Sequence, residues 1–188
     1  RRMADIYEET GFVEVEKNDV VVDVGSYLGA FSKQVADAAD TVFAIDPYYA
    51  FGDCYRLDLD KYGNICLSSK AAWNEQTTIA LNLSRNPSEN SVLAVDSRAT
   101  GGTVQVEANT VSGILEEENV SKIDFLKIEA EGVEPEILEE ALEMNPSKIS
   151  IQANEERNGD ASFPEVLELL DQEDYEIRSK NKMMYARR

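Results

Sequence analysis

The sequence predicts a doubly wound α/β fold, in which helices cover both faces of a mainly parallel sheet. Short apolar runs alternate with helix-like segments from Val20 onward. The first run, VVVDV at 20–24, has β-branched apolar residues on nearly every position, as a strand covered on both faces requires. Two strand-like segments, at 175–179 and 182–187, then close the chain without a helix between them. Such a pair is typical of a sheet with one reversed edge strand.

The first part of the chain predicts two βα units and a third strand. Gly25 and Gly29 follow the first strand and open a helix. In order, the expected elements are a strand at 20–24, a helix over about 30–39, a strand at 41–46, a helix within 48–60, and a strand with its exit at 64–73.

The middle of the chain departs from this alternation. Residues 77–83 and 102–108 alternate apolar and polar side chains, which is the pattern of half-exposed antiparallel strands. We therefore expect them to form an inserted β-hairpin. The stretch between them, 84–102, is rich in turn-forming residues, so we expect a mobile loop near the functional site.

The remaining part returns to alternating strands and helices. Pro135 suits the first turn of a helix. The expected elements are a short helix at 111–118, a buried strand at 123–129, a helix at 135–144, a strand at 148–154 and a helix at 163–172. The helix after Pro135 should bury one stripe, formed by Ile137, Leu138, Ala141 and Leu142.

Length and composition indicate one acidic domain, residues 1–188, in which 1–19 is an N-terminal helical lead-in. Lys and Arg number 18 against 37 Asp and Glu, a formal charge of -19, so nucleic acid and membrane surfaces are disfavoured as partners. The acids are spread along the chain and 43% of residues are hydrophobic, which favours a folded domain with an acidic shell. We expect a source that accumulates salt, because concentrated ions screen this self-repulsion.

The rare residue types limit the chemistry further. Cys54 falls in an expected helix and Cys66 in an apolar run, and the sequence has no histidine, which argues against a zinc site. No apolar stretch reaches membrane-spanning length and the N-terminus lacks the hydrophobic region of a secretory signal. We therefore expect a cytoplasmic protein.

The turn after the first strand is a candidate ligand-binding corner. Gly25 and Gly29 let the backbone bend, and the helix that follows presents unpaired N–H groups. Ser26 and Tyr27 stand where the dinucleotide motif has its second glycine, so a pyrophosphate would be crowded. A ligand without phosphates, such as S-adenosylmethionine, fits better. Asp46 ends the next strand about 20 residues beyond Gly25, where an acid is expected to hold ribose hydroxyls.

Two stretches of the chain resemble a known family in the same order. VVVDVGSYLGAFS at 20–32, followed by the acid of AIDP, and DFLKIEAEGVEPEILEEA at 124–141 are similar to motifs of the FkbM-type methyltransferases. KAAWNE and NPSENSVL are weaker echoes. This family uses S-adenosylmethionine and acts mostly on oxygen. The resemblance implies the class I methyltransferase fold, a Rossmann-like seven-stranded sheet with the last strand antiparallel.

The resemblance also implies cofactor roles by position. Gly25 and Gly29 would face the methionine and ribose part of S-adenosylmethionine. Asp23 would help to anchor its amino group, and Asp46 would hold the ribose diol. The remaining contacts would complete the turn or border the adenine, through Ser26, Tyr27, Pro47, Tyr48, Ala71 and Ala72.

Methyl transfer is an in-line displacement, so alignment and desolvation of the acceptor do most of the work. A hydroxyl acceptor also needs a base, which without histidine must be a carboxylate, lysine, tyrosine or metal-bound oxygen. Lys127 and Glu129 share one face of a strand and Glu131 lies in its exit turn, which makes these three the catalytic candidates. Lys127 and Glu129 could equally form a buried pair that fixes the strand exit. A magnesium or calcium site would require Glu129 or Glu131 to meet Asn154 or Glu155.

Three functions are compatible with these features. The first is an O-methyltransferase whose acceptor, a hydroxyl on a small molecule or glycan, enters over the loop at 84–102. The second is a nucleotide-using oxidoreductase on a related fold, against which the missing glycine argues. The third is a non-catalytic methyltransferase-like module with an empty or occluded pocket.

Overall fold

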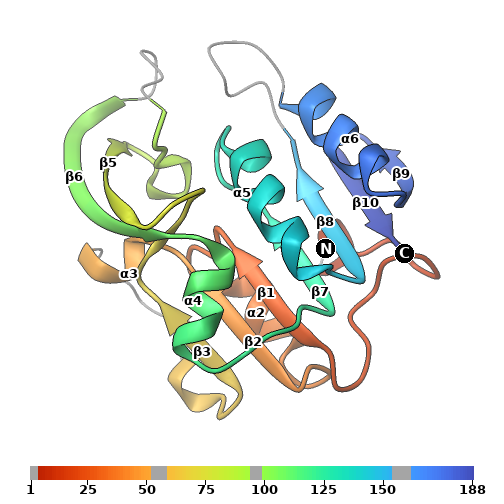
Figure 1. Ribbon diagram of the computed structural model, residues 1–188. Coiled ribbons are helices and arrows are strands. Elements are labelled where there is room, and N and C mark those ends of the chain that lie inside the picture. Colours follow the sequence, from red (N-terminus) through yellow and green to blue (C-terminus); the bar gives the residue numbers. More distant parts are fainter. Residues whose placement is uncertain (1–3, 52–58, 94–98, 154–161) are drawn as a thin grey trace.

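The computed structural model describes residues 4–51, 59–93, 99–153 and 162–188 (Figure 1). Seven of its strands form the main sheet in the order β3-β2-β1-β7-β8-β10-β9. Neighbouring strands from β3 to β8 pair in parallel. These five strands are β1 (Val20–Val24), β2 (Thr41–Ile45), β3 (Ile65–Ser68), β7 (Phe125–Ile128) and β8 (Lys148–Gln152).

The last strand runs against its neighbours, as the sequence predicts. β10 (Met183–Arg187) pairs antiparallel with β8 and with β9 (Glu176–Lys180). The expected seven-stranded α/β sheet with an antiparallel last strand is therefore confirmed. The reversed strand is not at the edge, however, because a tight turn at Asn181, with φ of 59°, folds β9 onto its outer side.

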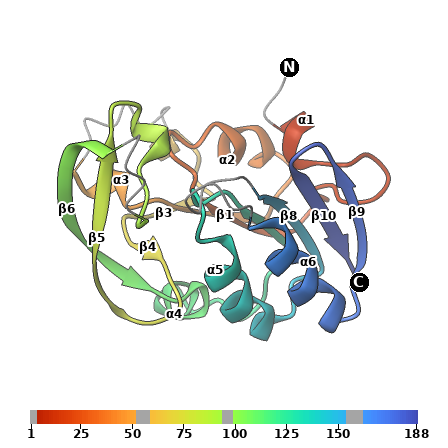
Figure 2. The same ribbon diagram turned by 90° about the horizontal axis from the view of Figure 1, so that it is seen from above.

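Helices cover both faces of this sheet (Figure 2). Alternate residues of β1 separate the two layers: Val22 and Val24 belong to the core under α4, α5 and α6, whereas Val21 packs with α1 and α2. The α-helices are α1 (Ala4–Tyr7), α2 (Ala30–Val35), α3 (Tyr48–Phe51), α4 (Val111–Glu117), α5 (Glu134–Ala141) and α6 (Phe163–Gln172). Short 3-10 turns are η1 (Leu59–Lys61), η2 (Pro87–Glu89) and η3 (Leu142–Met144).

A smaller three-stranded sheet stands beside the main one (Figure 1). β5 (Thr77–Ser84) and β6 (Ala99–Asn109) pair antiparallel, which confirms the expected inserted hairpin. β4 (Ala71–Ala72) pairs parallel with the end of β6. The strand expected over 64–73 therefore stops at Ser68, because its exit residues bond to the hairpin instead of continuing the main sheet.

Most helix boundaries follow the sequence pattern. α6 has the expected bounds, and the predicted stripe of α5 and η3 is buried at Ile137, Leu138, Ala141 and Leu142. The helix expected over 30–39 ends its regular form at Val35 and continues as turns. The helix expected within 48–60 is described only as α3 and η1, and Cys54 lies outside the described residues. Among the described helices, none is long and apolar enough to cross a membrane.

Candidate functional site

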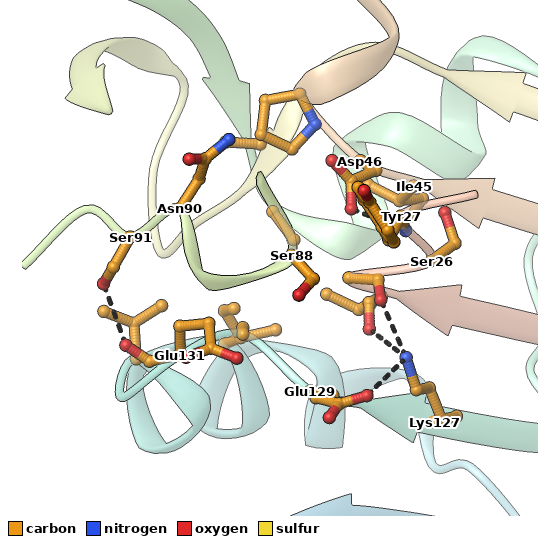
Figure 3. A pocket seen from close by; sticks show the side chains of 18 of the residues that line it. Ser26, Tyr27, Ile45, Asp46, Ser88, Asn90, Ser91, Lys127, Glu129 and Glu131 are labelled. Carbon is orange, nitrogen blue, oxygen red and sulfur yellow. Dashed lines mark hydrogen bonds and ion pairs between the residues drawn. The ribbon is translucent and has the colours of Figure 1, made fainter. Parts of the chain in front are cut away.

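A cavity of about 480 Å³ opens at the carboxyl ends of β1, β2 and β7 (Figure 3). β1 lies between β2 and β7, so the chain order of the parallel strands reverses here. Open α/β sheets bind ligands at this kind of switch point, because the loops after the two central strands diverge. The cavity is also bordered by residues of α1, of β4 and of the segment after β5.

The turn after β1 is docked tightly on both neighbouring strands. Gly25 has φ of 69°, and a Cβ atom there would lie 1.7 Å from the backbone oxygen of Glu129. Its N–H donates to the carbonyl of Ile45 at 3.0 Å. Glycine is therefore required at this position for both its backbone conformation and its close approach to β7.

Asp46, at the end of β2, holds the other side of the same turn. Its carboxylate accepts the backbone N–H of Tyr27 at 2.7 Å and that of Tyr48 at 2.8 Å. Burial raises the pKa of Asp46, against the effect of these two hydrogen bonds. Each carboxylate oxygen has a second lone pair, so Asp46 keeps acceptor capacity toward a ligand in the cavity.

Lys127 braces β7 against the turn after β1. Its Nζ donates to the carbonyls of Val24 at 3.1 Å and Gly25 at 2.9 Å, and it lies 3.0 Å from Asp23 and 3.6 Å from Glu129. Burial lowers the pKa of Lys127, but Asp23 and Glu129 outweigh it and the pKa is raised. The amine is thus held charged, which fits the predicted buried pair better than a proton-accepting role.

Asp23 lies beneath the turn and not in the cavity. It has no exposed surface, and its Oδ2 accepts the hydroxyl hydrogen of Ser32 at 2.6 Å. Its other oxygen faces Lys127. A direct contact between Asp23 and a ligand's amino group stays a prediction, and the geometry gives Asp23 the more evident task of neutralising Lys127.

Glu129 is positioned by two separate parts of the chain. Its backbone N–H donates to the carbonyl of Val24 at 3.1 Å. Its carboxylate accepts a hydrogen bond from the hydroxyl of Tyr7, which comes from α1 and also lines the cavity. Sequence reasoning missed Tyr7, because no pattern links a tyrosine of the N-terminal segment to a strand 122 positions away.

The exit turn of β7 is shaped by a buried acid. Glu131 and Gly132 both have positive φ, 52° and 101°. Glu134 Oε1 accepts the N–H groups of Ala130 at 3.1 Å and Gly132 at 3.0 Å, and its Oε2 accepts the hydroxyl of Ser162 at 3.0 Å. Burial raises the pKa of Glu134. These hydrogen bonds from the turn to Glu134 fix the predicted Glu-Gly turn, so that Glu131 borders the cavity.

The segment after β5 forms the remaining wall. Ser88, Asn90 and Ser91 line the cavity, and the Ser91 hydroxyl donates to the backbone oxygen of Glu131 at 2.8 Å (Figure 3). The Asn82 side chain holds this segment by donating to the carbonyls of Ser91 and Val92. The part of the expected loop that is described here does lie near the site, but it is hydrogen-bonded in place, and its expected mobility stays a prediction. Residues 99–102 of the expected loop belong to β6 instead. Residues 94–98 of the same loop lie outside the described ones.

Most of the predicted site residues meet in this cavity. Those on its wall are Gly25, Ser26, Tyr27, Asp46, Pro47, Ala71, Ala72, Lys127, Glu129 and Glu131. The wall does not include Asp23, Gly29 or Tyr48. Gly29 instead opens α2, where a Cβ atom would lie 2.3 Å from Leu59. One sequence feature indicated the serine-rich wall, namely the turn-forming segment NPSENSVL.

The metal hypothesis finds no support in the described ranges. No group of three or more Cys, Asp or Glu side chains there could hold an ion. Asn154 and Glu155, which the hypothesis needs, lie outside those ranges. Oε2 of Glu129 accepts a hydrogen bond from Tyr7 and faces Lys127 instead.

Comparisons with known proteins agree with this arrangement. A sequence model described as the Methyltransferase FkbM domain matches residues 19–177. No curated protein sequence matches the chain. The solved structure of methyltransferase FkbM from Methylobacillus flagellatus KT aligns with a TM-score of 0.68 at 15% identity, over 99% of this chain and 48% of that one. This chain therefore spans about half the length of that protein.

Two further structures are similar over most of both chains. Precorrin-6y C5,15-methyltransferase from Geobacter metallireducens GS-15 aligns with a TM-score of 0.53 at 12% identity, over 93% of this chain and 82% of that one. The protein SMU.1697c from Streptococcus mutans, in complex with S-adenosylhomocysteine, aligns with a TM-score of 0.53 at 10% identity, over 93% and 91%. These two likenesses support the class I methyltransferase fold.

Proposed function

Because this chain belongs to the FkbM methyltransferase family, we propose that it transfers the methyl group of S-adenosylmethionine to a hydroxyl on a small molecule or glycan. The observation that carries the proposal is the cavity at the switch point. The glycine turn, Asp46, Glu129 and Glu131 all border this space. A cofactor and an acceptor would therefore be brought together there.

The residues of this cavity suit the proposed cofactor. The ribose hydroxyls would donate to Asp46, and the apolar surface of Ile45, Ala71 and Ala72 would border the adenine. Its sulfonium and amino groups are cationic, and Asp46, Glu129 and Glu131 give the wall an excess of negative charge over Lys127. When bound, S-adenosylmethionine supplies an activated methyl carbon.

The protein's own contribution would be alignment, exclusion of water and acceptance of a proton. The Gly25 backbone and Asp46 would fix the cofactor, and the segment around Ser91 would enclose the acceptor. A carboxylate is the base that remains once Lys127 is held as an ammonium group. Glu129 and Glu131 are the two candidates for this role.

Isothermal titration calorimetry in concentrated KCl tests the proposal. We expect S-adenosylmethionine and S-adenosylhomocysteine to bind the wild-type protein, and Asp46→Ala to weaken both by about tenfold or more, since hydrogen bonds to charged groups contribute about 1.5–3 kcal/mol. Asp46→Asn keeps an acceptor for one of the two backbone N–H groups, so it should be less destabilising than Asp46→Ala and still bind more weakly.

Asp171→Ala is the matched control, because Asp171 is exposed on α6. This variant should bind S-adenosylmethionine and S-adenosylhomocysteine with the affinity of the wild type. Absence of binding by the wild type would refute the proposal, and binding of NAD in place of S-adenosylmethionine would favour the oxidoreductase alternative.

A further inference from the structure

Tyr7, in the N-terminal helix α1, contacts Glu129, one of the two proposed bases in the cavity wall. Its hydroxyl donates to Oε2 of Glu129, and its ring is only 2% exposed. Its ring also lies 4.9 Å from Nζ of Lys127, measured to the ring centroid. Tyr7 therefore contacts both charged groups of the catalytic strand from the opposite layer of the fold.

The hydroxyl of Tyr7 is held in place from two sides. Its ring packs edge to face on Phe31, with the centroids 5.3 Å apart. The preceding residue, Ile6, accepts a hydrogen bond through its carbonyl from the Tyr185 hydroxyl at 2.6 Å. Both the ring and the backbone of this segment are therefore fixed before any ligand enters.

The two oxygens of Glu129 have different surroundings. Oε2 accepts the Tyr7 hydroxyl and lies 3.6 Å from Lys127. Oε1 has no hydrogen-bond partner among the residues that the structure describes, and Glu129 borders the cavity. The carboxylate is thus anchored by one oxygen, which leaves the other available to a ligand.

We infer that Tyr7 is a positioning residue, whose hydroxyl, together with the Lys127 ammonium group, orients Glu129 so that Oε1 accepts the proton of the acceptor hydroxyl. This inference rests on the proposed function. In the step, the acceptor oxygen bonds to the methyl carbon and the carbon–sulfur bond breaks with its electron pair on sulfur. The acceptor's proton passes to Glu129 Oε1, so charge and atoms balance.

Tyr7 itself is poorly suited to be the base. Burial and the neighbouring Glu129 carboxylate raise its pKa far above the usual value for tyrosine. The phenol therefore stays protonated throughout the neutral range and acts as a donor.

The substitution Tyr7→Phe tests the inference through the NMR signal of the Glu129 carboxyl group. Glutamate would be labelled with ¹³C at the side-chain carboxyl, with Glu129→Gln identifying the Glu129 resonance. At a fixed neutral pH, Tyr7→Phe should shift this resonance, because Oε2 loses the hydroxyl hydrogen that it accepts.

Tyr175→Phe is the matched control, because the Tyr175 hydroxyl makes a similar buried hydrogen bond, to the Pro146 carbonyl at 2.6 Å, outside the cavity wall. Both variants should lose thermal stability, but only Tyr7→Phe should shift the Glu129 resonance. A purely structural Tyr7 would lower stability and leave that resonance unchanged, which overturns the inference.

Calorimetry on the same proteins separates the two hypotheses. Tyr7→Phe should bind S-adenosylmethionine within about threefold of the wild type, because the proposed role concerns the acceptor and not the cofactor. A wild type that binds no S-adenosylmethionine overturns the proposed function and the inference together. Cofactor binding with an unchanged Glu129 resonance overturns the inference alone.

Discussion

At the scale of single residues, the site depends on a few atoms that are tightly packed against their neighbours. The backbone of Gly25 contacts β7 where a side chain would collide with the Glu129 carbonyl. Nζ of Lys127 donates to two backbone carbonyls, one at the end of β1 and one in the turn after it. Asp23 balances its charge. β7 and the turn after β1 are therefore held as one rigid unit.

Gly25→Ala should be severely destabilising, by more than about 4 kcal/mol, because its Cβ would overlap backbone atoms that cannot rotate away. Substitutions at two other glycines separate the cost of positive φ from the cost of steric overlap. Gly11→Ala has positive φ but open space around the Cβ, so it should cost about 1–2 kcal/mol. Gly63→Ala has neither constraint and should change stability by less than about 0.5 kcal/mol.

Urea unfolding of the three glycine variants in concentrated KCl measures these differences. A Gly25→Ala protein as stable as Gly11→Ala would show that the turn relaxes away from β7. That result would contradict the rigid unit described above.

At the scale of elements, the exit of β7 is controlled from within α5 by Glu134. Its carboxylate satisfies two backbone N–H groups of the turn and the hydroxyl of Ser162. The helix therefore fixes the loop that precedes it, which presents Glu131 to the cavity. Position 134 should tolerate an acceptor of the same shape and little else.

Glu134→Ala should lower the free energy of unfolding by about 3 kcal/mol, because it leaves buried N–H groups without acceptors. Glu134→Gln keeps an acceptor oxygen and should cost less than about 1 kcal/mol at neutral pH. Glu139→Ala, exposed on the same helix, is the control and should be close to wild type.

The pH dependence of stability gives a second measure of Glu134. Burial raises its pKa in the folded protein above the ordinary value of 4.5, so the folded state binds the proton more tightly than the unfolded state. Its contribution to stability is therefore largest below pH 4.5 and falls as the pH rises through the raised pKa. Urea unfolding between pH 4.5 and 8 should show a smaller fall for Glu134→Gln than for the wild type. An equal fall would assign the pH dependence to other groups.

Local patterns predicted most elements because they depend on neighbouring residues. The strand VVVDV, the stripe of α5 and the Glu-Gly turn are each encoded within a few positions. Pairings between distant segments were harder to predict. Ala71 and Ala72 were expected at the exit of the third strand of the main sheet, yet they bond to β6. The edge position of β9 likewise depends on which side of β10 it folds to.

The same distinction applies to the site. Residues at strand ends were found because the carboxyl ends of parallel strands converge. Tyr7 was not, because its place is set by packing across the fold. The wall around Ser91 was expected from its turn-forming residues, but its hydrogen bond to Glu131 was not. The expected role of Asp23 toward a ligand's amino group stays a prediction, and in the structure Asp23 meets Ser32 and Lys127.

At the scale of the whole molecule, the acidic surface is the dominant property. The formal charge of -19 results from 37 acidic residues against 18 basic ones. Most of its described ion pairs are exposed, such as those of Arg187 and Lys122, and contribute little to stability. Net repulsion should therefore oppose folding in dilute buffer.

We expect the protein to require high salt, as a salt-accumulating source would supply. Raising KCl from about 0.1 M, where the screening length is about 10 Å, to 1 M, where it is about 3 Å, should raise the urea midpoint by about 1 M or more. Sodium sulfate at matched ionic strength would separate screening from stronger apolar burial. Full stability in dilute buffer would refute the halophilic hypothesis.

The hydrogen bond from Tyr185 to Ile6 also links the two ends of the sequence, which are 179 positions apart at this contact. α1, which carries Tyr7, is thereby attached to β10, the last strand of the chain. Tyr7 gains this support only after the C-terminal strand has formed. We therefore expect the contact between Tyr7 and Glu129 to become fixed late in folding.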